Sequence, residues 1–231
     1  MSDPARVLSV RELADSPEQW PVVEHRVLAR GNVTDFVEDV VTTPHGDRMR
    51  RQYTLHPGAV GVIALDAQDR VAVVLQYRHP AAHSLIEPPA GLLDLPGEDY
   101  LVAAQRELAE EAGLAASDWR VLVDLFTTPG ATQESVRIYL ARGLTPAPRP
   151  DGFEPESEEA VMEVAWAGRA DIVDAILDGR LQNPVLVAGV LALEAAEASG
   201  RLEQLRPADA PWPSREVRDT QNSRLSDGDA G

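Results

Sequence analysis

The sequence predicts an α/β protein in which one main domain follows a shorter β-rich segment. Three observations support this expectation. The chain has 231 residues, 44% of them hydrophobic, which suffices for one domain with a real core and an appendage. Short Val-rich runs bounded by turn residues are typical of strands. Apolar residues at three- and four-residue steps indicate helices.

Residues 1–55 are expected to form an N-terminal β-rich segment. Alternating runs at 22–29 and 36–41 predict strands, and the turn Pro44-His45-Gly46-Asp47 follows them. So few strands cannot bury a core of their own. The segment is therefore expected to pack on the main domain or on a second subunit.

Residues 56–205 are expected to form the main domain, opened by a turn at His56-Pro57-Gly58. Its predicted strands are the runs 59–65, 71–77, 121–126, 135–141 and 161–166. Its predicted helices cover 101–112, 170–177 and 184–198. From residue 206 onward the composition is typical of a disordered tail.

The helix predicted at 101–112 carries an unusual charge pattern. Glu107, Glu110 and Glu111 lie at i, i+3 and i+4 and share one helical face, and Gly113 follows as a left-handed cap. Like charges at this spacing repel by a few tenths of a kcal/mol. Acidic groups in a last turn also oppose the helix dipole by about 0.3–1 kcal/mol each. A solvated charged face is the plain alternative, but a divalent cation would remove the repulsion.

Composition restricts the function classes. The net charge of −17 argues against nucleic-acid binding, and the one basic cluster is Arg48, Arg50 and Arg51. The absence of Cys excludes disulfides, thiolate zinc sites and Cys nucleophiles. No signal peptide and no apolar run of 18 residues is found, so the chain is expected to be soluble, cytoplasmic and not bound to a membrane.

The stretch from residue 91 to 114 resembles the Nudix box. Seven residues after Glu98 comes Arg106-Glu107-Leu108-Ala109-Glu110-Glu111-Ala112-Gly113-Leu114, which matches every fixed position of the second half of the box. Six residues rather than five separate Gly91 from Glu98, and Pro96-Gly97 suggests that the extra residue lies in a turn. The segments HPGAV, LQYRHP and PPAGLLD, with Pro129 fifteen residues after the box, resemble the ADP-ribose pyrophosphatase branch.

The resemblance implies a Nudix-type α/β/α sandwich with a mixed β-sheet, and a homodimer formed through the N-terminal segment. It implies metal-dependent hydrolysis of ADP-ribose to AMP and ribose 5-phosphate. Two alternatives stay open: another nucleoside diphosphate sugar or dinucleotide as substrate, and a non-hydrolytic ADP-ribose-binding sensor. The sensor is disfavoured because all four box glutamates are present.

The chemistry assigns roles to individual residues. Mg²⁺, with Mn²⁺ as the alternative ion, prefers oxygen ligands, which suits the three helix glutamates. The resemblance adds the carbonyl of Ala90 to the ligands, and Glu98 either joins them or supports them. Arg106 is expected to pair with Glu98 or another box carboxylate and so to brace the loop. The resemblance places the general base on the acidic loop, at Glu158 or Glu159. Glu110 counts among the catalytic residues as well as the metal ligands. The remaining assignments are structural support from Arg106, Gly91, Gly113 and Pro129, and substrate contacts from Arg78, Arg50 and Arg51.

An adenine ring would need an aromatic platform. The candidates are Phe36, Tyr53 and Trp20. None of the five His has a metal-ligand partner at useful spacing, and they are expected to be non-catalytic.

Overall fold

The computed structural model describes residues 5–95, 97–148 and 162–219. In chain order it contains β1 (Val22–Arg30), β2 (Asp35–Thr42), β3 (Arg48–Leu55), β4 (Ala59–Ala64), β5 (Arg70–Arg78), β6 (His83–Glu87), β7 (Ala90–Leu92), α1 (Tyr100–Ala112), β8 (Leu114–Phe126), β9 (Ser135–Pro146), β10 (Glu163–Gly168), α2 (Arg169–Leu177), α3 (Pro184–Ala198) and β11 (Arg206–Pro207). Short 3₁₀ turns lie at Val10–Glu12, His79–Ala81 and Leu202–Gln204.

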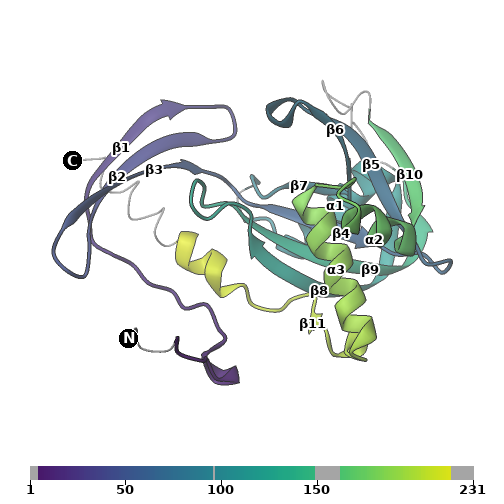
Figure 1. Cartoon of the computed structure of the whole chain (residues 1–231). Helices are drawn as coiled ribbons and strands as arrows, with labels where there is room; N and C mark the ends of the chain where they lie inside the picture. The colour runs from purple at the N-terminus through teal and green to yellow at the C-terminus, as the bar shows by residue number, and fades with distance from the viewer. Residues whose placement is uncertain (1–4, 96, 149–161, 220–231) are drawn as a thin grey trace.

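The main domain is built on a five-stranded sheet with the order β11-β8-β9-β4-β7. Strands β4 and β9 run parallel and the other pairs antiparallel, so the sheet is mixed as predicted. A second sheet, β10-β5-β6, stands beside it (Figure 1).

Helices cover both faces of the five-stranded sheet, and successive side chains of β4 point to opposite faces. Val60 and Val62 point to a core shared with Leu108 of α1, whereas Ile63 points to a core shared with Val190 of α3. The α/β/α sandwich predicted from the sequence is therefore confirmed.

The N-terminal segment forms a three-stranded antiparallel sheet, β1-β2-β3, beside the main domain (Figure 1). The sequence predicts β1 and β2 but not β3, whose many Arg and polar residues hide its strand character. The sheet buries Val37 and Val40 and joins the main domain at His56. The division of the chain at residue 55 stays a prediction.

The C-terminal segment differs from the predicted disordered tail. Residues 206–207 add strand β11 to the sheet, and residues 213–219 form a helix. Trp212 is only 2% exposed. Composition alone missed this order because a few large side chains fix the segment to the core; residues 220–231 lie outside the described part.

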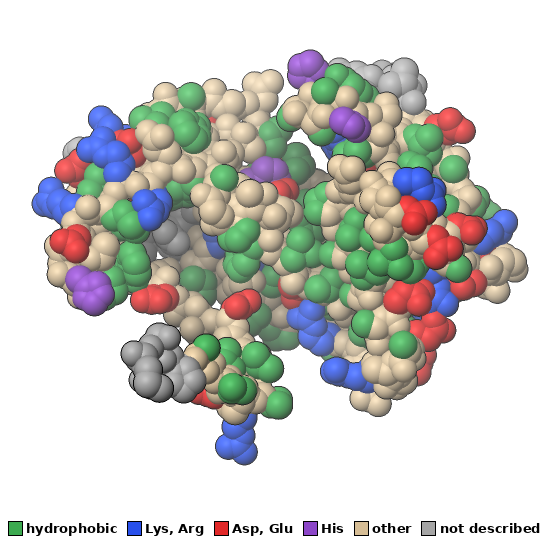
Figure 2. All heavy atoms as spheres, in the orientation of Figure 1, with side chains coloured by type: hydrophobic (Ala, Val, Ile, Leu, Met, Phe, Trp, Pro, Cys, Tyr) green, Lys and Arg blue, Asp and Glu red, His purple; other side chains and the backbone are tan. Residues whose placement is uncertain are grey.

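Charged side chains of both signs are interspersed over the face that carries α2 and α3 (Figure 2). Among the described residues, no helix combines the length and the apolar character that crossing a membrane requires.

Candidate active site

Helix α1 begins and ends on specific caps. The carboxylate of Asp99 accepts hydrogen bonds from the backbone N–H groups of Leu101 and Val102, at 2.8 and 3.3 Å. At the other end Gly113 adopts φ 64° and donates its N–H to Ala109, as the sequence predicts. These caps fix the ends of the helix, so the faces on which its glutamates lie are set.

Two glutamates of α1, Glu107 and Glu111, lie against strand β7. Glu107 and Glu111 are buried, with 9% and 8% of their surfaces exposed. The carboxylate of Glu111 accepts a hydrogen bond from the backbone N–H of Ala90 at 2.8 Å. The solvated charged face considered from the sequence is therefore wrong for these two residues, because their side chains lie against the strand.

Gly91 is required by the position of Glu107. A Cβ atom built at Gly91 would overlap the carboxyl group of Glu107. The glycine thus allows the carboxylate to lie directly on the backbone of β7.

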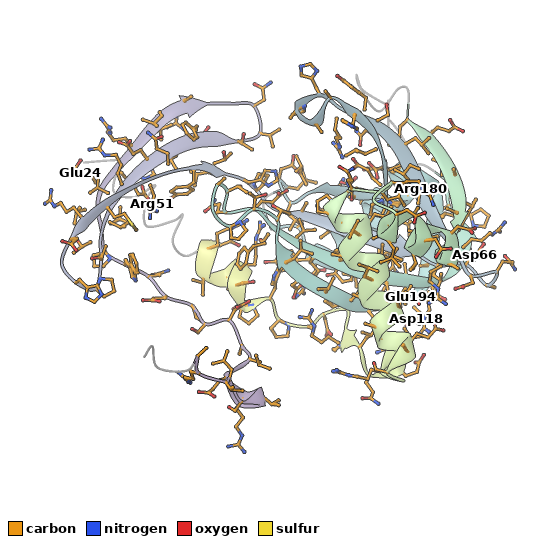
Figure 3. The ribbon with its side chains drawn as sticks, viewed as in Figure 1. Glu24, Arg51, Asp66, Asp118, Arg180 and Glu194 are labelled. Carbon is orange, nitrogen blue, oxygen red and sulfur yellow. The ribbon has the colours of Figure 1, made fainter. Side chains whose placement is uncertain are left out.

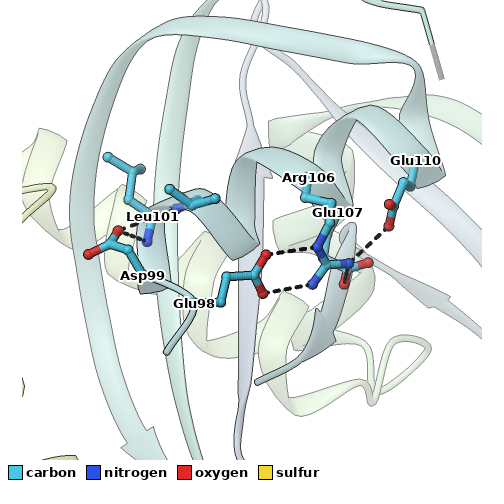
Figure 4. A network of polar contacts seen from close by, with 7 residues as sticks. Glu98, Asp99, Leu101, Arg106, Glu107 and Glu110 are labelled. Carbon is cyan, nitrogen blue, oxygen red and sulfur yellow. Dashed lines mark hydrogen bonds and ion pairs between the residues drawn. The ribbon is translucent and has the colours of Figure 1, made fainter. Parts of the chain in front are cut away.

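Arg106 connects the loop before α1 to the carboxylate face (Figure 4). Its guanidinium donates to both oxygens of Glu98 at 3.0 Å, to Glu107 at 2.6 Å and to Glu110 at 3.0 Å. These interactions, the hydrogen bond to Glu98 foremost, raise the pKa of Arg106 and keep it charged. The bracing role predicted for Arg106 and Glu98 agrees with this geometry.

The extra residue between Gly91 and Glu98 is absorbed by the turn. Gly97 has φ 78°, and an added Cβ there would meet nothing within 4 Å. The backbone N–H of Glu98 donates to the carbonyl of Leu95 at 3.2 Å, which closes the turn. Glu98 therefore still reaches Arg106 despite the longer loop.

The donor set fits a hard divalent cation. One guanidinium faces the three carboxylates of Glu98, Glu107 and Glu110, so acidic groups outnumber basic ones in this set of four side chains. In the described ranges, no three Asp, Glu or His side chains are already arranged around one point as metal ligands. Arg106 Nη1 donates to both Glu107 and Glu110. Carboxylate oxygens are the ligands that Mg²⁺ prefers, so these side chains are of the type that could hold such an ion.

A substitution at Gly91 tests this arrangement. We expect Gly91→Ala to displace the carboxylate of Glu107 and to lower kcat by about tenfold or more, since a tenfold change needs only about 1.4 kcal/mol. Steady-state kinetics would measure the change. The control is Gly200→Ala, just after α3, where an added Cβ also meets nothing within 4 Å; its φ of 65° can cost stability, but kcat should stay at the parent value. Parent-like kinetics in Gly91→Ala would contradict the placement of Glu107.

The predicted substrate arginines lie in two places. Arg78 makes two hydrogen bonds to the buried Glu87, at 2.9 and 2.7 Å, a partner that the sequence did not indicate. Arg50 and Arg51 lie on β3, and Arg50 pairs with Glu38 at 3.1 Å. Figure 3 shows Arg51 on the N-terminal sheet, well separated from the main domain helices. The structure does not bring these arginines together.

A cavity of about 530 Å³ lies between the N-terminal sheet and the loop that follows β8. Of the predicted aromatic platform, Trp20 and Tyr53 line it, whereas Phe36 does not. Arg51 and Pro129 also line it. The cavity therefore unites four residues that were singled out separately from the sequence.

The wall of this cavity contains a buried polar network that the sequence did not indicate. Asp39 accepts a hydrogen bond from Tyr53 at 2.8 Å and lies 2.6 Å from His25 Nδ1. Burial, together with Asp39, raises the pKa of Tyr53 and keeps its hydroxyl protonated. Only the cross-strand register reveals the network, because His25 and Asp39 are paired positions of β1 and β2. Glu158 and Glu159 lie outside the described residues.

The fold and site define an α/β sandwich with a braced glutamate-rich helix against a sheet-edge strand. The chain belongs to the NUDIX domain family, whose model matches residues 55–187. The resemblance stated from the sequence is thereby confirmed.

Known proteins are similar over most of the chain. An ADP-ribose pyrophosphatase of Mycobacterium tuberculosis is 42% identical over 196 residues, which cover 85% of this chain and 92% of the relative. An ADP-ribose pyrophosphatase of Bacillus subtilis is 30% identical over 69% of this chain and 85% of its own length. A solved structure of an ADP compounds hydrolase shares the fold, with a TM-score of 0.64 at 23% identity, covering 82% of this chain and 100% of that one.

Proposed function

We propose that this Nudix protein hydrolyses the diphosphate linkage of ADP-ribose to AMP and ribose 5-phosphate. The observation that carries the proposal is the carboxylate face of α1, in a chain 42% identical to an ADP-ribose pyrophosphatase over nearly the whole length of that relative. In the reaction, the oxygen of water forms a bond to one phosphorus while the bond from that phosphorus to the bridging oxygen breaks. The water proton must be removed, and the departing phosphate carries the electron pair.

Glu107, Glu110 and Glu111, with the Ala90 carbonyl and Glu98, are proposed to hold the divalent ion, Mg²⁺ or Mn²⁺. When bound, the ion would neutralise charge on the phosphate oxygens and acidify water. The hydrogen bond from Ala90 N–H orients Glu111, and Arg106 holds Glu98, Glu107 and Glu110 in place until the ion enters.

The cavity between the N-terminal sheet and the main domain is proposed to receive the nucleoside half of the substrate. Trp20 and Tyr53 offer ring faces, and Arg51 offers a charged donor beside them. Arg78 and Arg50 are the further proposed phosphate contacts, for which each would have to leave its present carboxylate partner. Pro129 is proposed to shape the loop that bounds the cavity.

A substrate screen tests the activity. The purified chain would be assayed with ADP-ribose, other nucleoside diphosphate sugars and dinucleotides, with and without Mg²⁺ or Mn²⁺. Metal-dependent release of AMP from ADP-ribose at the highest kcat/KM is the expected result. A higher kcat/KM on another substrate would correct the specificity. Binding of ADP-ribose without hydrolysis would instead support a non-hydrolytic sensor.

Glu158 or Glu159 is proposed as the base that removes the water proton. We expect Glu158→Gln or Glu159→Gln to lower kcat by about a hundredfold with little change in KM, since general base catalysis contributes about 10²–10⁴. Glu156→Gln, from the same loop, is the control and should keep the parent kcat. If neither of the first two variants loses activity, the base lies elsewhere.

A homodimer formed through the N-terminal segment is the proposed assembly. Val7, Val10 and Leu13 are 90%, 87% and 67% exposed, and a second copy of the chain would cover such side chains. We expect light scattering at micromolar concentration to give about twice the chain mass of 25.0 kDa. A single 25.0 kDa species would refute the dimer. The cytoplasm is the proposed location, because a chain without Cys needs no oxidising compartment.

A further inference from the structure

The C-terminal strap, residues 206–219, crosses the main domain in a defined course. Strand β11 pairs with β8, and the buried Arg137 donates hydrogen bonds to the carbonyls of Ala210 at 2.6 Å and Pro211 at 3.0 Å. A helix then begins at Pro213, a residue well suited to a first helical position. In Figure 1 this helix lies between the N-terminal sheet and the main domain.

Trp212 attaches the strap to the beginning of α1. It belongs to the same hydrophobic core as Ala104 and Leu108 of that helix. Its ring meets the ring of Tyr100 edge to face, with 5.2 Å between centroids and 84° between planes. Tyr100 is the first residue of α1, so the strap contacts the helix just after the loop that carries Glu98.

Arg215 connects the strap to the other end of the same loop. It is 7% exposed and donates hydrogen bonds to the carbonyl of Pro57 and to Asp219. A Cβ atom at Gly58 would overlap the guanidinium of Arg215, so the glycine is needed for this contact. The carbonyl of Gly58 in turn accepts a hydrogen bond from Leu93 N–H at 3.0 Å, where the loop begins.

The guanidinium of Arg215 therefore lies between both ends of the loop. On one side it donates to the Pro57 carbonyl, which also accepts from Arg218, and on the other it lies 5.9 Å from the ring centroid of Tyr100. A cavity of about 500 Å³ separates the loop from the strap, and Glu98 and Arg215 both line it. At its start the loop is also fixed by Leu93, which lies in the same buried cluster as Trp212 of the strap.

We propose that Arg215 is a positioning residue for the carboxylate face of α1. By fixing the distance between the Gly58 turn and the first turn of α1, it sets where Glu98 meets Arg106 and hence how Glu107 and Glu110 are presented. This role rests on the proposed function of those carboxylates as metal ligands. The action is indirect, because Arg215 forms no hydrogen bond to any of them among the interactions of the described residues.

Mn²⁺ binding to the full chain, without substrate, tests the proposal. Free Mn²⁺ would be measured by its electron paramagnetic resonance signal. We expect Arg215→Ala to weaken Mn²⁺ binding by about tenfold, the lower end of the effect seen when residues that orient metal ligands are lost. The matched control is Arg206→Ala, which removes another strap arginine, one paired with Asp124 at 2.7 Å on β8. The control should bind Mn²⁺ within about twofold of the parent, well below the tenfold loss expected for a residue that orients metal ligands.

Hydrogen exchange separates positioning from general stability. We expect faster exchange in Arg215→Ala at the amides of residues 93–101, and not in Arg206→Ala. Unchanged exchange there, or parent-like Mn²⁺ affinity in a folded Arg215→Ala variant, would overturn the proposal. If Arg215→Ala does not fold, Arg215→Lys is tested instead, because it keeps the charge but not the planar guanidinium. The proposal then requires faster exchange in the loop of this variant. Parent-like exchange would overturn it. A parent chain that binds no Mn²⁺ would refute the proposed metal site. Hydrogen exchange at the loop amides would still test whether Arg215 positions the loop.

Discussion

Replacing Glu111 by Gln should lower kcat on ADP-ribose by about a hundredfold or more and leave the fold intact. The side-chain oxygen of Gln can still accept the hydrogen bond that Ala90 N–H gives to Glu111 at 2.8 Å. The substitution therefore removes a negative charge from the proposed metal ligand without opening a cavity. Losing about 3 kcal/mol of transition-state stabilisation, within the range that metal ions supply, gives about a hundredfold.

Steady-state kinetics at saturating Mg²⁺ would measure this effect, and thermal unfolding would verify the fold. Glu203→Gln is the control, because its side chain is 73% exposed and pairs with Arg142, away from the site. The control should keep both kcat and Tm. Activity of Glu111→Gln within tenfold of the parent would refute the assignment of Glu111 as a metal ligand.

The predictability of α1 rests on local physics. Its apolar stripe, its Gly113 cap and its shared glutamate face follow from helical periodicity, and all are present in the structure. The strands β4, β5 and β9 were also predicted, because buried strands are short Val-rich runs. The contact of Glu107 with Gly91 needs the pairing of β7 with β4, which periodicity does not give.

Features made by distant residues were missed for the same reason. The cavity joins Trp20 to Pro129 across more than a hundred positions of the sequence. The network of His25, Asp39 and Tyr53 depends on the register of three strands. The strap looked disordered because its polar composition hides two anchors, Trp212 and Arg215. In each case the decisive partner lies far away in the chain, where local pattern carries no information.

Replacing Arg106 should show that its guanidinium and a bound Mg²⁺ compete for the same carboxylates. Its side chain is 25% exposed, and the side chains of its three partners, Glu98, Glu107 and Glu110, are 12%, 11% and 15% exposed. Removing the guanidinium leaves their charges close together and poorly hydrated. We expect Arg106→Ala to destabilise the fold by about 2 kcal/mol, below the 3–5 kcal/mol for fully buried pairs because water reaches this one. For a chain of this length that lowers Tm by about 4–8 °C.

Mg²⁺ should then restore stability to Arg106→Ala more than it stabilises the parent. In the parent, an ion that binds Glu107 and Glu110 must compete with the guanidinium of Arg106. In the variant this competitor is gone, so Mg²⁺ should bind the folded state more tightly and stabilise it more than it stabilises the parent. Thermal unfolding with Mg²⁺, compared with NaCl at equal ionic strength, measures the difference. Arg142→Ala is the matched control: Arg142 is also 25% exposed and pairs with Asp118 and Glu203, which are not among the carboxylates of the proposed metal site. Because its loss creates no metal site, its Tm should fall without a larger response to Mg²⁺. An equal Mg²⁺ response in the parent and Arg106→Ala would mean that Arg106 and the ion do not share these carboxylates.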